Sequence, residues 1–259
     1  MIYNEDCKIT MARMEPKSVD VILTSPFYNT NKKAGSKSTL ENTTTKNGDY
    51  PWTRYDCHID NMTNEEYDDY TVDLFLLFDK ILKPNGVILY NMSYGNNNTD
   101  GMISAVNSVL SKTPFALADI IVWKKKNALP NNCSPNRLTR IVEFIYVFCR
   151  TTESGTFYAN KKIISTRTNG QKMYENIFNF VEAANNDGSC SLNKATYSSE
   201  LCKKLLSIYC PQNGLVYDPF MGTGTTAVAC EEMGLSWCGS EISTKQVEYA
   251  NNRINKKKG

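Results

Sequence analysis

Short apolar runs alternate with stretches of helical periodicity along most of the chain. The run Val19–Thr24 is rich in β-branched residues and lies between two prolines, which predicts a buried strand. Residues 64–82 carry apolar side chains at helical spacing, and Thr63 with Glu66 forms a capping-type start. After a turn at 83–86, the other expected elements are strand 87–91, helix 102–111, strands 116–124 and 142–149, helix 198–210, strand 215–217, helix 226–233, strand 236–240 and helix 244–254.

This order of strands and helices predicts an α/β fold with a doubly wound, mostly parallel sheet of the Rossmann-like type. Two polar segments lie outside the pattern. Residues 25–60 show little apolar periodicity, and residues 151–193 are polar and irregular. Long loops in compact domains are usually functional or disordered. We therefore expect one domain in two halves, 1–150 and 194–259, with 151–193 as an insertion.

Composition places the chain among globular proteins without a membrane span. It has 259 residues, of which 41% are hydrophobic and 22% charged, and its net charge is +2. No apolar run approaches the roughly 20 residues that cross a bilayer. The first six residues include acids where a signal peptide needs a basic start. We expect a protein of the cytoplasm of a bacterial or viral host cell, with no membrane partner.

Cysteine and histidine usage argues against metal and triad chemistry. The nine cysteines include no CxxC pair, and several lie in apolar contexts where a reduced thiol acts as a small hydrophobic side chain. A single histidine, His58, disfavours a zinc site or a Ser-His or Cys-His triad. We expect no metal site. The cysteines in apolar contexts are Cys149, Cys202, Cys230 and Cys238.

A glycine-rich turn near the C-terminus predicts a cofactor site. Gly222-x-Gly224-x-x-Ala227 follows a predicted strand and opens a helix, and its glycines permit a tight turn close to a ligand. The next strand ends at Glu241, from which a carboxylate can bind both hydroxyls of a ribose. An adenosine-type cofactor is expected. Too little chain follows for a second nucleotide-binding half, so the N-terminal part must complete the sheet.

A second turn, Ser25-Pro26-Phe27-Tyr28, follows the strand that ends at Thr24. Open α/β sheets bind ligands at this end of their strands. The Ser25 hydroxyl and the Pro26 carbonyl can accept hydrogen bonds from an amine, and Tyr28 can stack on a planar base. Such an amine needs its lone pair localised rather than a proton removed beforehand. No general base is therefore required.

Together, Ser-Pro-Phe-Tyr at 25–28 and Asp-Pro-Phe-x-Gly-x-Gly at 218–224 resemble the catalytic and cofactor motifs of DNA amino-methyltransferases. That family modifies the exocyclic amine of cytosine (N4) or adenine (N6). The catalytic motif comes first, which is similar to the beta class. Phe27 replaces a second proline that the family usually has, which implies either a less rigid turn or an extra aromatic wall in the pocket. The resemblance also covers residues 4–7, 82–87, 121–125, 137–143 and 193–210.

The resemblance implies S-adenosylmethionine as methyl donor and DNA as partner, with the target base extruded from the duplex. The catalytic residues would be Ser25, Pro26, Phe27 and Tyr28. The cofactor would be held by Asp6 and Cys7 near its adenine ring, by Asp218 and Thr226 near its methionine end, and by Phe220, Gly222, Gly224, Thr225 and Glu241.

The resemblance implies that residues 1–150 form the catalytic half of the domain and residues 194–259 the cofactor-binding half. Residues 151–193 would form a target-recognition region. Loop 29–60 would also contact DNA. Basic side chains expected to bind phosphates or base edges are Lys32, Lys33, Arg54, Lys124, Lys161 and Arg167.

Serine at position 25 is the commoner form in cytosine-N4 enzymes and aspartate in adenine-N6 enzymes, which favours cytosine and keeps adenine as the alternative. An RNA methyltransferase and a catalytically idle nucleic-acid-binding module are further alternatives. A cognate restriction endonuclease is a candidate partner, and the chain is expected to be a monomer or a homodimer.

Overall fold

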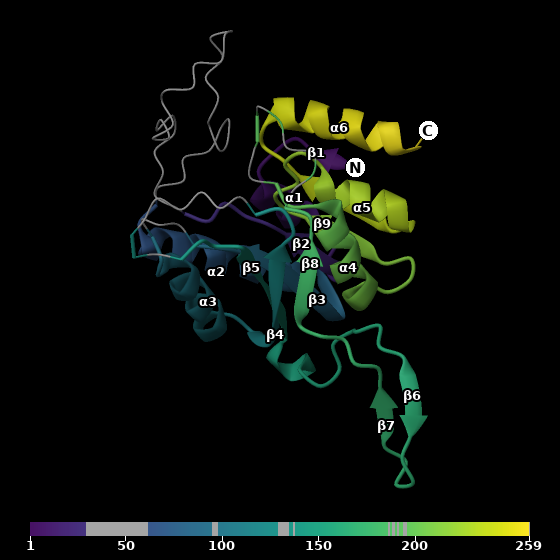
Figure 1. Ribbon diagram of the computed structural model, residues 1–259. Coiled ribbons are helices and arrows are strands. Elements are labelled where there is room, and N and C mark those ends of the chain that lie inside the picture. Colours follow the sequence, from purple (N-terminus) through teal and green to yellow (C-terminus); the bar gives the residue numbers. More distant parts are fainter. Residues whose placement is uncertain are drawn as a thin grey trace.

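The protein is built on one eight-stranded, mostly parallel sheet, seen in a computed structural model that describes residues 1–29, 62–94, 98–128, 135–136, 138–185, 187, 190, 192–193 and 196–258 (Figure 1). Strand β5 is antiparallel to β3 and β4, and the other neighbours are parallel, as predicted. From edge to edge the strands are β1 (Ile2–Tyr3), β10 (Ser236–Ser240), β9 (Leu215–Asp218), β2 (Val19–Thr24), β3 (Leu82–Met92), β5 (Val142–Arg150), β4 (Phe115–Lys125) and β8 (Phe180–Ala183).

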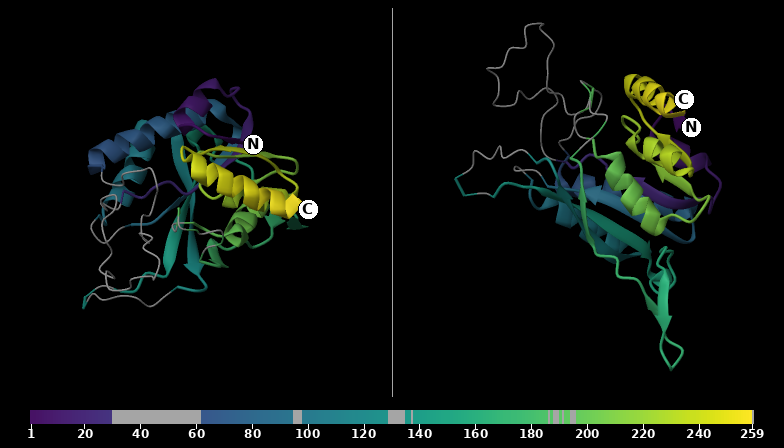
Figure 2. Two further views of the ribbon diagram at one scale, coloured as in Figure 1. Left: turned by 90° about the horizontal axis from the view of Figure 1, so that it is seen from above. Right: turned by 45° about the vertical axis from the view of Figure 1, so that its right-hand side comes forward.

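Helices cover both faces of the sheet (Figures 1 and 2). One face packs against α1 (Cys7–Arg13), α2 (Asn64–Ile81) and α3 (Gly101–Lys112). The other packs against α4 (Ser199–Tyr209) and α5 (Thr225–Met233), and α6 (Thr244–Lys258) lies on α5. This arrangement confirms the doubly wound fold expected from the alternation of strands and helices.

The central strands are buried on both faces, which explains their continuous apolar runs. In β2, Ile22 belongs to the core on the α2 side, while Val21 and Leu23 belong to the core on the α4 side. Strand β5 divides in the same way, with Phe148 on the first side and Val147 on the second. Successive side chains of a strand point to opposite faces, so a strand between two helical layers needs apolar residues at every position.

The predicted turn at 83–86 is wrong, because α2 runs directly into β3 at Leu82. The pairing of β2 with β3 jumps from Val19–Leu82 to Val21–Val87, so residues between them form a bulge inside the strand. A Cβ on Gly86 would lie 2.8 Å from the Asp20 carbonyl oxygen. The Lys-Pro-Asn-Gly signal therefore marks a bulge and a close backbone approach.

Segment 151–193 contains more regular structure than its polar composition predicts. A turn of 3₁₀ helix, η1 (Thr151–Glu153), precedes a hairpin of β6 (Ile163–Thr166) and β7 (Lys172–Tyr174) that projects from the body (Figure 2). Strand β8 then joins the main sheet beside β4, with Val181 and Ala183 buried. The expectation of an irregular segment is wrong for β8, and the expected limits of the recognition region stay a prediction.

Two short elements, β1 and α1, have no counterpart in the prediction, since two and seven residues are too few to show a period. Buried Cys149, Cys202 and Cys230 fit the expected role of small hydrophobic side chains, while Cys238 is partly exposed. In the described part of the chain, no helix has the length and apolar character that a membrane crossing requires.

The Asp20 carboxylate joins three neighbouring strands. Its Oδ2 accepts hydrogen bonds from Lys83 Nζ in β3 at 2.6 Å and from the Leu215 N–H in β9 at 2.8 Å. The side chain is mostly buried, with 16% exposed. This bridge fastens the last part of the chain to the first.

We predict that Asp20→Ala lowers the free energy of unfolding by about 1–3 kcal/mol, because the Leu215 N–H loses its partner in a partly buried place. Urea denaturation measures the change. Asp69→Asn is the control, since Asp69 forms an exposed 3.0 Å ion pair with Lys112 and should change stability by less than about 1 kcal/mol. Equal losses in both variants would contradict a special role of the bridge.

Candidate active site

The carboxyl ends of β2, β9 and β10 meet at one edge of the sheet, because these strands are parallel neighbours. Ser25 follows β2, the glycine-rich turn follows β9, and Glu241 follows β10. Three segments that are far apart in the sequence are therefore brought to one place.

The glycine-rich turn binds the acidic residue that follows β10. The Gly222 N–H donates to Glu241 Oε2 at 2.8 Å, and the Ser243 N–H donates to Oε1 at 2.9 Å. Gly222 has φ +52°, a left-handed conformation that favours glycine. These two backbone N–H groups hold the Glu241 carboxylate in place at the pocket.

Asp218 lies beneath this turn with 1% of its surface exposed. Its Oδ1 accepts from Thr24 Oγ1 at 2.7 Å and from the Phe220 N–H at 3.0 Å. Its Oδ2 accepts from Tyr197 Oη at 3.2 Å and from Thr226 Oγ1 at 2.5 Å. Burial raises the pKa of the carboxyl, and these hydrogen bonds act in the opposite direction. Asp218 therefore braces the turn from below, and it does not line the pocket above.

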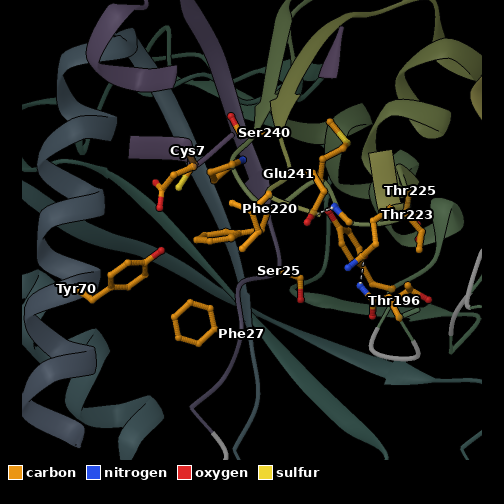
Figure 3. Close-up of a pocket in the computed structure, with 18 residues that line it drawn as sticks. Cys7, Ser25, Phe27, Tyr70, Thr196, Phe220, Thr223, Thr225, Ser240 and Glu241 are labelled. Carbon is orange, nitrogen blue, oxygen red and sulfur yellow. Dashed lines mark hydrogen bonds between the residues drawn. The ribbon is translucent and has the colours of Figure 1, made fainter. Parts of the chain in front are cut away.

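One pocket at this edge contains most of the predicted cofactor residues (Figure 3). Ser25 lies between an aromatic side and a threonine-rich side in this view. The predicted residues that line the pocket are Asp6, Cys7, Ser25, Phe27, Phe220, Gly222, Thr225 and Glu241. Those that do not line it are Pro26, Tyr28, Asp218, Gly224 and Thr226.

Gly224 is required for a different reason from the one expected. It has φ +82°, and a Cβ there would lie 2.9 Å from the Cβ of Ala250 in α6. The glycine permits close packing of α6 on the start of α5, rather than space for a ligand. At Gly222, by contrast, a Cβ would approach Asn193 Nδ2 to 3.2 Å, and both residues line the pocket.

The other side of the pocket is aromatic and apolar. The Phe27 ring packs edge-on against Phe220 at 6.1 Å between centroids, and it packs in a tilted arrangement against Tyr70 at 5.4 Å. The position usually held by a second proline thus supplies an aromatic wall, which is one of the two alternatives expected from the sequence. Burial raises the pKa of the Cys7 thiol to about 12, so the group is neutral at physiological pH.

The groups around the pocket fit an adenosyl cofactor. Phe220 and Cys7 offer an apolar surface to a planar base, and Glu241 offers acceptors to paired hydroxyls. The site matches the chemistry expected from the glycine-rich turn and the acid after the next strand.

Several lining residues were missed by sequence reasoning. Tyr70 lies on the apolar face of α2, where its spacing indicates core packing. Gln246 accepts a hydrogen bond from Asn193 Nδ2 at 3.0 Å. Asn193 begins the segment 193–210 that the resemblance covers, whereas Gln246 belongs to no recognisable motif. Thr196 and Tyr197 lie in the same segment 193–210. The remaining lining residues are close in sequence to the glycine-rich turn or to Glu241, and they are Pro219, Met221, Thr223, Ser240 and Ile242.

The turn that begins at Ser25 is anchored at its backbone. Tyr67 Oη in α2 donates to the Phe27 carbonyl at 2.6 Å, and Asn98 Nδ2 donates to the Asn29 carbonyl at 2.8 Å. Ser25 Oγ lies 2.8 Å from Tyr28 Oη. The Tyr28 side chain is 7% exposed and lies behind Ser25 rather than in the pocket wall. Its stacking on a base stays a prediction.

The expected DNA contacts divide into three groups. Lys32, Lys33 and Arg54 lie outside the described residues. Lys124, near the end of β4, forms an ion pair with Glu182 at the carboxyl edge of the sheet.

Lys161 and Arg167 lie at the other end of the molecule. The chain before the hairpin is held there by a 2.9 Å bond from the Tyr158 N–H to the carbonyl of Asn85, near the amino end of β3. The structure therefore separates these two exposed side chains from the pocket (Figure 1).

Comparison with known proteins agrees with this geometry. Type II methyltransferase M2.LlaDCHI from Lactococcus lactis subsp. cremoris is 23% identical over 99% of this chain and 89% of its own length. Type II methyltransferase M2.DpnII from Streptococcus pneumoniae is 23% identical over 98% of this chain and 88% of its own.

Solved structures show the same fold. PvuII DNA methyltransferase (cytosine-N4-specific) superimposes with a TM-score of 0.70 at 16% identity, over 98% of this chain and 85% of that one. The complex of M1.HpyAVI with SAM gives 0.58 at 21% identity, over 98% of both chains. The family model of the N6/N4 DNA methylases matches residues 19–252. With its catalytic motif before its cofactor motif, as in the beta class, the chain belongs to the N6/N4 DNA methylase family.

Proposed function

We propose that the protein transfers a methyl group from S-adenosylmethionine to N4 of a cytosine extruded from DNA. The observation that carries this proposal is a single pocket lined by both Ser25 and Glu241, from opposite ends of the chain. Membership of the family makes the protein a DNA methyltransferase that uses S-adenosylmethionine. The choice of base and the role of each residue belong to the proposal.

Within the pocket, the chain's own groups divide the work of binding the cofactor. Phe220 and Cys7 would contact the adenine ring, with Asp6 beside them, and Glu241 would accept hydrogen bonds from the ribose hydroxyls. Gly222 and Thr225 would contact the methionine part. Asp218, Thr226 and Gly224 would act through the turn, since they brace it without lining the pocket. When bound, the cofactor supplies an activated methyl group.

The catalytic turn would bind the extruded base. Ser25 Oγ and the Pro26 carbonyl would accept hydrogen bonds from the amine and direct its lone pair toward the methyl group. Tyr28 would contact the base face, and Phe27 would separate the base from the adenine site. Extrusion costs a few kcal/mol of unstacking, which pocket contacts offset. Rate acceleration would come from positioning and from stabilising the positive charge that develops on nitrogen.

Cytosine is favoured by the serine at position 25. The cytosine-N4 specificity in the name of PvuII DNA methyltransferase, at a TM-score of 0.70, supports the same choice. Adenine N6 is the alternative, because both bases offer an amine beside a ring nitrogen acceptor. The Type II names and bacterial sources of the relatives support a cognate restriction endonuclease and a cytoplasmic location.

DNA would approach the carboxyl edge of the sheet, where Ser25 and Lys124 lie. Lys32, Lys33 and Arg54 are proposed contacts from the loop that follows the catalytic turn. Lys161 and Arg167 project from the opposite edge and would reach only DNA that extends around the protein.

The first test is the product. Purified protein incubated with S-adenosylmethionine and unmethylated genomic DNA should yield N4-methylcytosine after digestion to nucleosides and mass spectrometry. N6-methyladenine instead would keep the mechanism and reverse the choice of base. No methylated base on duplex or single-stranded DNA would contradict the proposal and direct attention to RNA or to a binding module without activity.

Tyr28→Ala should lose most of the turnover and keep its affinity for S-adenosylmethionine near that of the wild type. The side chain contacts Ser25 and lies outside the cofactor pocket. Calorimetry of cofactor binding and a methylation assay separate the two effects. Equal loss of both would show that Tyr28 supports the fold or the cofactor site instead.

The two glycines of the turn should respond differently to alanine. A side chain at a left-handed position costs about 1–2 kcal/mol at either site. Gly224→Ala adds a clash with Ala250, so its unfolding temperature should fall further, whereas Gly222→Ala should lose more cofactor affinity because its Cβ faces Asn193. Thermal unfolding and calorimetry measure both quantities. Stronger loss of affinity in Gly224→Ala would contradict the assignment.

A further inference from the structure

A connected polar network lies behind the catalytic turn. Tyr28 Oη donates to Glu143 Oε2 at 3.1 Å and lies 2.8 Å from Ser25 Oγ. Lys125 Nζ donates to Glu143 Oε1 at 2.6 Å. Asn91 Nδ2 lies 2.8 Å from Tyr28 Oη, 3.1 Å from Glu143 Oε2 and 3.2 Å from Ser25 Oγ. Glu143 itself does not line the pocket.

The network is shielded from water. Asn91 is 1% exposed, and the side chains of Glu143 and Lys125 are 13% and 21% exposed. In such surroundings two acceptors that face each other without a hydrogen between them are destabilising, because water cannot supply the missing hydrogen bond. The direction of each hydrogen bond therefore matters.

One direction along the chain gives each contact between two oxygens a hydrogen. An ionised carboxylate only accepts, so the single hydroxyl hydrogen of Tyr28 goes to Glu143. The 2.8 Å contact between Ser25 and Tyr28 must then use the hydrogen of Ser25. A hydroxyl oxygen has two acceptor sites. The two hydrogens of Asn91 Nδ2 serve three oxygens, so they occupy at most one of the acceptor sites on Ser25. One lone pair of Ser25 remains for the pocket.

We propose that Glu143 is a positioning residue that orders these hydroxyl hydrogens and makes Ser25 Oγ a hydrogen-bond acceptor toward the substrate amine. The inference rests on the proposed function, in which Ser25 receives an amine N–H. Lys125 forms an ion pair with the Glu143 carboxylate, and this ion pair supports Glu143 as a hydrogen-bond acceptor. Glu143 acts at a distance from the reacting atoms, through Tyr28.

The orientation of the Asn91 amide supports this direction. Its nitrogen faces three oxygens, while its Oδ1 is buried without a hydrogen-bond partner among the described residues. Rotating the amide would place Oδ1 against the Glu143 carboxylate, where two acceptors repel. The amide thus points its N–H groups at the network, although this leaves Asn91 Oδ1 unpaired and lowers the free energy of unfolding.

Glu143→Gln tests the proposal because its size is conserved and its amide can donate. A donor at this position can reverse the chain, so that Tyr28 donates to Ser25 and the Ser25 hydrogen meets the amine. Single-turnover methylation of genomic DNA fragments, with a radiolabelled methyl group and excess enzyme, should slow by about 10- to 100-fold. Affinity for S-adenosylmethionine should stay near that of the wild type, and loss of the ion pair with Lys125 should lower the unfolding temperature.

A double-mutant cycle separates ordering of hydrogens from general support of the fold. Tyr28→Phe keeps the ring and breaks the chain, so adding Glu143→Gln should change its rate by less than about twofold. Glu143→Asp keeps an acceptor and should be faster than Glu143→Gln.

Asp69→Asn is the matched control, since it also replaces a carboxylate beside a lysine, Lys112, on the exposed surface. If Glu143→Gln does not fold, Glu143→Asp and Tyr28→Phe still test the chain.

The proposal is overturned if Glu143→Gln methylates at the wild-type rate, or if its loss is the same in the Tyr28→Phe background. A rate for Glu143→Gln above that of Glu143→Asp would also overturn it, since size would then matter more than acceptor chemistry. Failure of the proposed function is distinct: the wild type would then methylate no DNA base.

Discussion

The buried carboxylate of Asp218 is the interaction on which the site depends. It receives hydrogen bonds from Thr24 at the end of β2, from Tyr197 before α4 and from Thr226 in α5. A single buried group thus connects the catalytic turn, the glycine-rich turn and both helices next to them. A carboxylate with 1% exposure is stable there only because donors satisfy both oxygens. Loss of any one of these donors would be felt at the cofactor site and at Ser25 together.

The antiparallel strand β5 connects the site to the rest of the sheet. Near its first residue, Glu143 contacts the hydroxyl of Tyr28. At its last residue, Arg150 donates to the Asp79 and Leu82 carbonyls, which lie at the end of α2. The carbonyls at a helix end lack partners within the helix, so this arginine completes the hydrogen bonding of α2. The same strand therefore supports the active edge and closes the opposite one.

The end of the catalytic turn has an unfavourable backbone conformation and an unpaired buried polar atom among the described residues. Asn29 has φ +48°, and its buried Oδ1 has no hydrogen-bond partner among the described residues. Gly222 and Gly224 are also left-handed. Left-handed backbone and unpaired polar atoms persist only where surrounding contacts fix them. Here Tyr67 and Asn98 fix the turn by binding its carbonyl oxygens, so a polar surface is held rigidly beside the pocket.

The sequence alone determined the fold class, the bounds of β2 and β10 and both motifs, because apolar period, helix caps and glycine turns are local properties. It did not reveal which strands are neighbours, since pairing depends on contacts between distant residues. Only the tertiary structure placed Ser25 beside Glu241, showed that Gly224 faces Ala250, and turned Glu143 toward Tyr28. It also placed Arg167 at the far edge, because β5 reverses direction and carries the chain away from the pocket.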